Sequence, residues 1–143
     1  MGQQQLLLLV LGIVIVGLAV VVGIQAFSEN QQKANLDAMV NDGVRIASDL
    51  QAWSLKPQAF GGPGTDEDHS DATFDDLGYQ TNDSDEYVNL NGTYTLTQSG
   101  DDAVIAGTGT GANSNNSVTI TVSGTTPSDI ETVTSSTAAG DDT

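Results

Sequence analysis

The chain has 143 residues, of which 19 are Asp or Glu and only three are Lys or Arg, and its formal net charge is −16. So acidic a surface repels the phosphates of nucleic acids and anionic lipid headgroups, which excludes both as partners of the charged part of the chain. There is no cysteine, so disulfides and cysteine-based metal or redox chemistry are excluded. Any globular part therefore depends on packing alone.

The first 28 residues carry no charge, and residues 6–27 form an apolar run that contains three glycines. At about 1.5 Å per residue, a helix of this length measures about 33 Å and spans a hydrocarbon core of about 30 Å. An ordinary secretory signal has a cationic start and a shorter apolar stretch of about 7–15 residues, so a cleaved signal is the less favoured interpretation. The run predicts a membrane or filament-core segment.

Helical periodicity continues beyond the apolar run. No proline occurs before Pro57, so we expect one helix from about residue 2 to residue 54, apolar all round in its first half and amphipathic in its second. Its charged side, on which Arg45 can pair with Asp42 and Asp49, is expected to face solvent. The apolar stripe that we expect to pack on a sheet comprises Leu36, Met39, Val40, Ile46, Leu50 and Trp53.

Small residues gather on one side of the apolar half, within about 60° of one another on a helical wheel. Such a stripe lets two helix backbones approach closely, although Gly and Ala are common in membrane helices in any case. We favour helix–helix packing along this face, and Gly17 lies off it. The stripe consists of Gly12, Ala19, Gly23 and Ala26.

Residues 55–78 are predicted to form a loop, because Pro57 and the Gly-Gly-Pro-Gly sequence at 61–64 break regular structure. An acidic tract at 66–76 lies within this loop and contains the single histidine, His69. Oxygen-rich loops bind calcium, but this tract lacks the turn glycine and the terminal glutamate of an EF-hand. A solvated acidic loop with a solvated histidine is the favoured interpretation.

Beyond this loop the pattern changes to that of β-strands. Two segments with alternating apolar residues, 87–90 and 93–97, flank Asn91-Gly92, which is a strong signal for a hairpin with a two-residue turn. Further short strands are predicted at 103–106 and 117–123, with a weaker one at 130–133.

The chain is therefore predicted to be α+β, with a long N-terminal helix packed on a small antiparallel sheet. Residues 1–54 form the helix, of which 6–27 are the apolar segment, and the amphipathic stripe covers the apolar face of the sheet. Residues 55–143 form an acidic, β-rich head with flexible loops and a Thr- and Ser-rich tail.

No catalytic site is predicted, because one histidine, three basic residues and no cysteine support neither a nucleophile–base pair nor a phosphate clamp. We expect no enzyme activity, no cofactor and no dedicated metal site. Three sequons mark candidate glycosylation sites at Asn82, Asn91 and Asn115, although such matches also arise by chance in a chain rich in Asn, Ser and Thr.

A long N-terminal helix that is apolar in its first half and covers an antiparallel sheet with its second resembles the type IV pilins and related filament subunits. The resemblance implies a precursor held in the inner membrane, cleaved by a prepilin peptidase and assembled by pilus machinery into an extracellular filament of identical copies. It also implies that Met1 is the processed, N-methylated first residue. Gln5 then stands where most bacterial members carry glutamate, and an amide there can hydrogen-bond a neighbour's amine but gives no ion pair.

The leading functional hypothesis is thus a structural, major pilin-like subunit at the cell surface. One alternative is a minor pseudopilin-like component of a secretion or DNA-uptake machine. The other is a monomeric, membrane-tethered surface protein.

Overall fold

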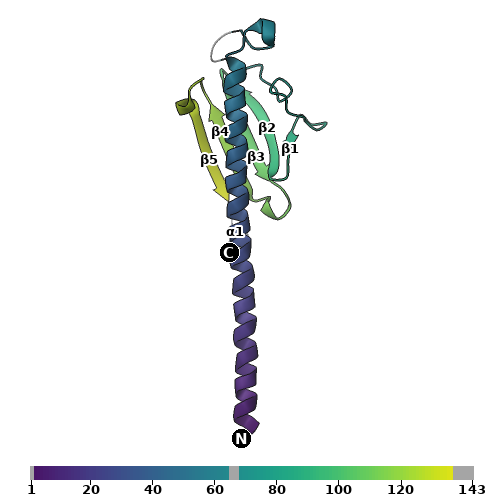
Figure 1. The fold of residues 1–143 in the computed structure, drawn as a ribbon, viewed down its shortest axis with the longest axis vertical. Helices are drawn as coiled ribbons and strands as arrows, with labels where there is room; N and C mark the ends of the chain where they lie inside the picture. Colours follow the sequence, from purple (N-terminus) through teal and green to yellow (C-terminus); the bar gives the residue numbers. More distant parts are fainter. Residues whose placement is uncertain (1, 65–67, 137–143) are drawn as a thin grey trace. The chain divides into compact units, whose positions relative to one another are not determined.

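A computed structural model describes residues 2–64 and 68–136. The chain divides into two compact units, one ending at Lys33 and the other beginning at Ala34. A single uninterrupted helix, α1 (Gly2–Ser54), confirms the predicted helix over residues 2 to 54 (Figure 1). The half of α1 from Ala34 onward belongs to the same unit as the sheet.

Helix α1 ends at Ser54, shortly before Pro57. The Ser54 hydroxyl donates a hydrogen bond to the carbonyl of Gln51, and the Lys56 N–H turns back to the carbonyl of Trp53. Pro57 follows, and a proline disfavours helical backbone at the residue before it. The Trp53 indole N–H then donates to the carbonyl of Gly61 at 3.0 Å, which ties the first loop to the end of α1.

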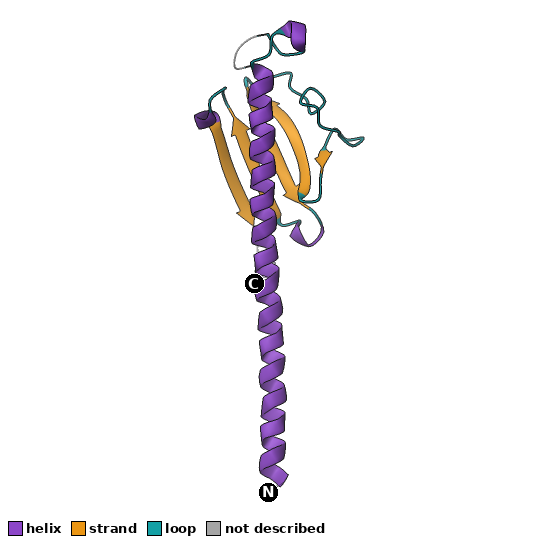
Figure 2. Ribbon diagram, viewed as in Figure 1, coloured by secondary structure: helices purple, strands orange, loops and turns teal. Residues whose placement is uncertain are grey.

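The sheet has five antiparallel strands in sequential order, and α1 crosses one of its faces (Figures 1 and 2). This arrangement confirms the predicted α+β fold. Strand β3 is longer than predicted, and the weak strand expected at 130–133 is a full seven-residue partner of its neighbour. The strands are β1 (Tyr87–Val88), β2 (Gly92–Ser99), β3 (Asp102–Gly109), β4 (Asn116–Val122) and β5 (Ile130–Ser136).

Side chains alternate across the central strands, so that one face of the sheet is buried and the other is partly exposed. The register places Ile105 opposite Ile120 on the buried face. Gly107 lies on the same face, between Tyr94 and Val118 in the neighbouring strands. A Cβ at Gly107 would come within 2.8 Å of both neighbouring side chains, so glycine leaves the room that the Tyr94 ring occupies.

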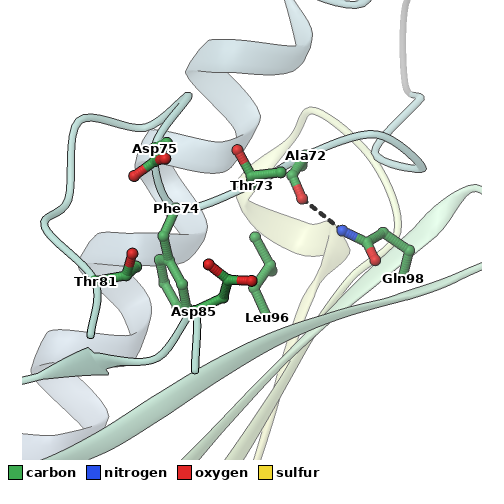
Figure 3. Close-up of a pocket in the computed structure, with 8 residues that line it drawn as sticks. All are labelled: Ala72, Thr73, Phe74, Asp75, Thr81, Asp85, Leu96 and Gln98. Carbon is green, nitrogen blue, oxygen red and sulfur yellow. Dashed lines mark hydrogen bonds between the residues drawn. The ribbon is translucent and has the colours of Figure 1, made fainter. Parts of the chain in front are cut away.

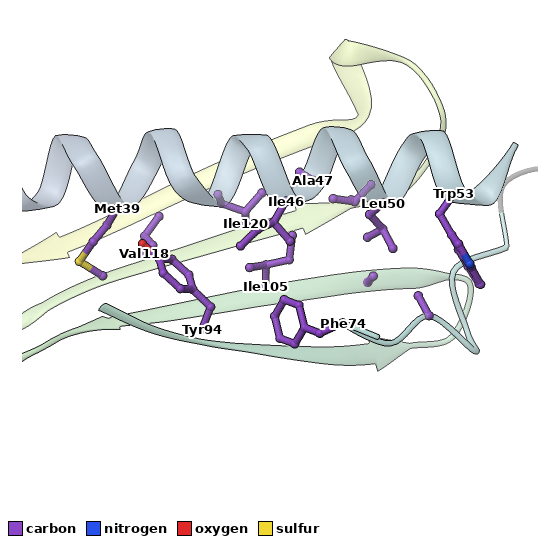
Figure 4. Packing of buried hydrophobic residues seen from close by; sticks show 13 residues of the cluster. Met39, Ile46, Ala47, Leu50, Trp53, Phe74, Tyr94, Ile105, Val118 and Ile120 are labelled. Carbon is purple, nitrogen blue, oxygen red and sulfur yellow. The ribbon is translucent and has the colours of Figure 1, made fainter. Parts of the chain in front are cut away.

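The core forms where the second half of α1 meets the buried face of the sheet (Figure 4). From the predicted stripe, Met39, Ile46, Leu50 and Trp53 are at most 4% exposed and belong to this core. Val40 packs against the core while partly buried, and Leu36 is half-buried at the start of this packed half. The helix approaches the sheet closely at Gly43, where a side chain would collide with the tip of Ile120.

The hairpin between β1 and β2 exists, but the predicted two-residue turn at Asn91-Gly92 is wrong. Gly92 is the first residue of β2 and pairs with Gly109 of β3. The turn lies over residues 89–91, because Asn89 Oδ1 accepts hydrogen bonds from the backbone N–H groups of Asn91 and Gly92. An Asn side chain that caps its own turn in this way takes the place of the predicted two-residue turn.

The expectation of a solvated His69 is also wrong, because the residue is fully buried. Its backbone N–H donates to the carbonyl of Asp101 at 3.3 Å, and its ring Nδ1 lies 3.1 Å from the same oxygen. The loop that carries His69 is thereby fastened to the turn between β2 and β3. The ring fills space in the head as a structural element.

Replacing Leu50 by Ala tests the core. Leu50 is fully buried, so L50A should lower the free energy of unfolding by about 2–5 kcal/mol. The matched control is L55A, because Leu55 is 57% exposed and the same truncation there should change stability by no more than about 0.5 kcal/mol. Urea titration in non-ionic detergent, followed by fluorescence of the single tryptophan, measures both variants. Equal effects at the two positions would contradict the assigned core.

Candidate functional site

The most unusual surface of the described chain is the first half of α1. Every residue from Gly2 to Gln31 is exposed, although most of them are aliphatic. Large apolar side chains between Leu6 and Phe27 expose between 52% and 70% of their area. Soluble monomers rarely expose a contiguous apolar patch beyond a few hundred Å², so a surface of this kind marks a membrane or protein contact.

By length and composition, α1 is able to cross a membrane. Its apolar part is uninterrupted helix, so its backbone groups satisfy one another internally, as hydrocarbon surroundings require. A long apolar helix near the N-terminus is thus compatible with a membrane anchor.

The four residues of the small-residue stripe, Gly12, Ala19, Gly23 and Ala26, all lie on the exposed part of α1. Space around Gly12 and Gly23 is open, with no atom within 4 Å of a Cβ built at either position. Nothing in the single chain uses this stripe, so its part in helix packing stays a prediction. Gln5 is exposed on the first turns of the same helix, and Met1 lies outside the described residues.

On the packed half of α1, Asp42 anchors the hairpin between β1 and β2. Its Oδ2 accepts hydrogen bonds from the amides of Asn89 and Asn91, at 2.8 and 2.7 Å, and from the hydroxyl of Tyr94 at 3.1 Å. The expectation that Asp42 faces solvent is therefore wrong. A carboxylate that accepts several hydrogen bonds stabilises the turn residues which supply them.

Asp49 and Arg45 also point at the head rather than pairing with each other. Asp49 accepts the hydroxyl hydrogen bond of Tyr79, and the Arg45 guanidinium lies 5.9 Å from the centre of the Tyr79 ring. The expected pairing of Arg45 with the two aspartates is thus replaced by a cation–π contact.

Two amide side chains complete the attachment of the helix to the loops. Gln51 is buried, and its Nε2 donates to the carbonyls of Gly124 and Thr126, at 2.9 and 2.8 Å. Asn35 donates to the carbonyl of Asn91 and accepts from the amide of Asn116. Periodicity alone does not reveal these residues, because on a helical wheel a polar side chain that meets a loop looks the same as one that faces water.

The sequons differ in accessibility. The Asn91 amide is committed to Asp42, and Asn82 uses its side chain to cap its own turn, with Oδ1 accepting from the N–H groups of Ser84 and Glu86. Asn115 is exposed in the loop before β4. Of the three amides, the one at Asn115 is the most accessible.

The acidic tract does not form a metal centre in the part of it that the structure describes. Asp66 and Glu67 lie outside the described residues. Over residues 2–64 and 68–136, no group of three His, Cys, Asp or Glu side chains is arranged to hold a metal ion.

Comparison of the chain with protein-family models, with curated proteins and with solved structures finds no match. The function must therefore be argued from the exposed apolar helix and the head that it carries.

The buried phenols make stability depend on pH in the alkaline range. Burial, and then the neighbouring carboxylate of Asp42, raise the pKa of Tyr94 well above its usual value. Above about pH 10 the unfolded chain releases this proton while the native state retains it, so the free energy of unfolding falls as pH rises. Y94F should make this alkaline slope shallower, measured by urea titration across about pH 8 to 12. An unchanged slope would contradict the assigned burial and contact.

Proposed function

We propose that this chain is a pilin-like structural subunit that polymerises through the apolar half of α1 into an extracellular filament, from a membrane-anchored precursor. The observation that carries the proposal is the exposure of the mostly apolar residues 6–27 on a helix whose other half is the cover of an antiparallel sheet. A helix that is apolar all round requires lipid or other helices around it. Bundled copies of the same segment provide such surroundings outside the membrane.

Leaving the bilayer exchanges lipid contacts for protein contacts, so the hydrophobic effect contributes little to the difference. Association then depends on close packing between helices, which small residues favour. The stripe that includes Gly12 and Gly23 supports the proposal, since small residues gathered on one side of the helix let a neighbouring backbone approach closely. We assign to this stripe the closest contacts between neighbouring helices.

The acidic head suits the outer surface of such a filament. All 19 acidic residues and all three basic ones lie beyond residue 28, so the assembled apolar segments bring no charge into the core. A strong net negative charge on the heads keeps filaments soluble and apart. The same distribution fits a membrane-tethered monomer, which is the second candidate, because that protein needs only the anchor.

Substitution of Gly23 by Leu tests the assembly proposal. A leucine within a close helix contact overpacks it at a cost of about 1–3 kcal/mol, so filament yield should fall at least about fivefold. Yield is measured as the chain recovered in the sheared surface fraction, with filaments counted by electron microscopy.

G17L is the matched control, because it adds the same side chain about 120° away from Gly23 on the helix. It should retain most of the filament yield. Equal yields for the two variants would contradict the role of the stripe. Absence of filaments from the unmodified protein, together with a monomer in detergent, would overturn the polymer and favour the tethered monomer.

Processing gives an independent prediction. If the chain follows the pilin pathway, the N-terminal peptide of the surface-exposed protein begins at Met1 and carries one additional methyl group. Mass spectrometry of the sheared fraction and of the membrane fraction measures both features. An unmethylated first residue would contradict assignment to that pathway.

A further inference from the structure

A pocket of about 250 Å³ lies in the head between the loop at residues 72–85 and strand β2 (Figure 3). It belongs to no contact described so far. Phe74 and Leu96 give it an apolar floor, and Phe74 is only 3% exposed. The ring is held in place by Tyr79 and Tyr87, whose ring centres each lie 6.1 Å from its own. The floor is therefore a fixed hydrocarbon surface.

The polar groups around this floor are mainly hydrogen-bond acceptors. The Gln98 amide nitrogen donates to the carbonyl of Ala72, which leaves the Gln98 side-chain oxygen available (Figure 3). The hydroxyl of Thr73 is committed to the carboxylate of Asp76. Thr81 adds one hydroxyl to the lining. The protein thus supplies few donors at this site.

Two of the lining residues are aspartates, Asp75 and Asp85. Over the part of the chain that the structure describes, neither carboxylate has a hydrogen-bond or ion-pair partner. Asp85 has a φ of +58°, in the left-handed region. Its N–H donates to the carbonyl of Asn82, whose side chain caps the same turn, so the turn that presents Asp85 is preorganised.

We propose that this pocket binds a primary alkylammonium group, with its aliphatic stem on Phe74 and Leu96. An ammonium carries a positive charge and donates hydrogen bonds, and two carboxylates, those of Asp75 and Asp85, line the pocket. The proposal concerns the head and is independent of whether the chain polymerises.

Other ligand classes match the pocket less well. A calcium ion takes six to eight oxygen ligands, whereas the floor of this pocket is the hydrocarbon of Phe74 and Leu96. A sugar presents hydrogen-bond acceptors as well as donors, so it needs donor groups from the protein. Among the lining side chains, Thr81 offers one such group, its hydroxyl. Two carboxylates beside an apolar floor are complementary to a cation that has an apolar stem.

The test is an NMR titration of the ¹⁵N-labelled full chain, in non-ionic detergent at low salt, with n-butylammonium chloride. We expect saturable shifts of the Gln98 side-chain amide and the Asp85 backbone amide, and no saturable shift with n-butanol. D85N, which keeps a residue tolerant of positive φ, should weaken binding about tenfold, and D75N should act in the same direction. D83N is the matched control, since it removes the same charge from the same loop outside the pocket.

Equal weakening by D83N and D85N would show only general charge attraction and would overturn the proposal. Saturation by calcium chloride, with no response to n-butylammonium, would also overturn it. Should D85N fail to fold, the comparison of n-butylammonium with n-butanol on the unmodified protein still decides the outcome. A second arm uses N-acetyl-lysine methylamide: binding of both amines means that a protein lysine side chain fits the pocket, whereas binding of n-butylammonium alone limits the ligand to free amines.

Discussion

The packing of the second half of α1 across one face of the sheet is the contact on which the rest of the head depends. A five-stranded meander with one apolar face is not stable in water unless that face is covered, and this chain has no disulfide to assist it. The cover comes from Met39, Ile46, Leu50 and Trp53, which are spaced to lie on one side of the helix. Gly43 brings the helix axis close to the sheet at Ile120.

Polar contacts then select one arrangement among those that burial alone would permit. Asp42 binds the β1–β2 hairpin, Gln51 binds the β4–β5 connection, and Asn35 joins Asn91, just before β2, to Asn116 at the start of β4. Each of these side chains sits beside the apolar stripe and satisfies groups that burial would otherwise leave without partners. Hydrophobic packing holds the helix on the sheet, and these hydrogen bonds set its register.

The carboxylates of the head outnumber its basic side chains. With three basic residues among 19 acidic ones, most carboxylates have no cation to pair with. Asp42 and Asp49 accept hydrogen bonds from neutral donors of the head, including the tyrosines Tyr94 and Tyr79. Asp75 and Asp85 lie instead beside an open pocket, which is why a cation from outside the chain fits there.

The sequence by itself determined the long helix, its two chemically different halves, the α+β class and the face of the helix that is buried. These features follow from periodicity between residues three or four positions apart, which is local information. Only the tertiary structure decided the turn at 89–91, the burial of His69 and the role of Asp42. Each of them depends on a partner more than ten residues away, the carboxylate of Asp42 for the turn and the carbonyl of Asp101 for His69. A helical wheel cannot distinguish a polar side chain in water from one that meets a distant loop.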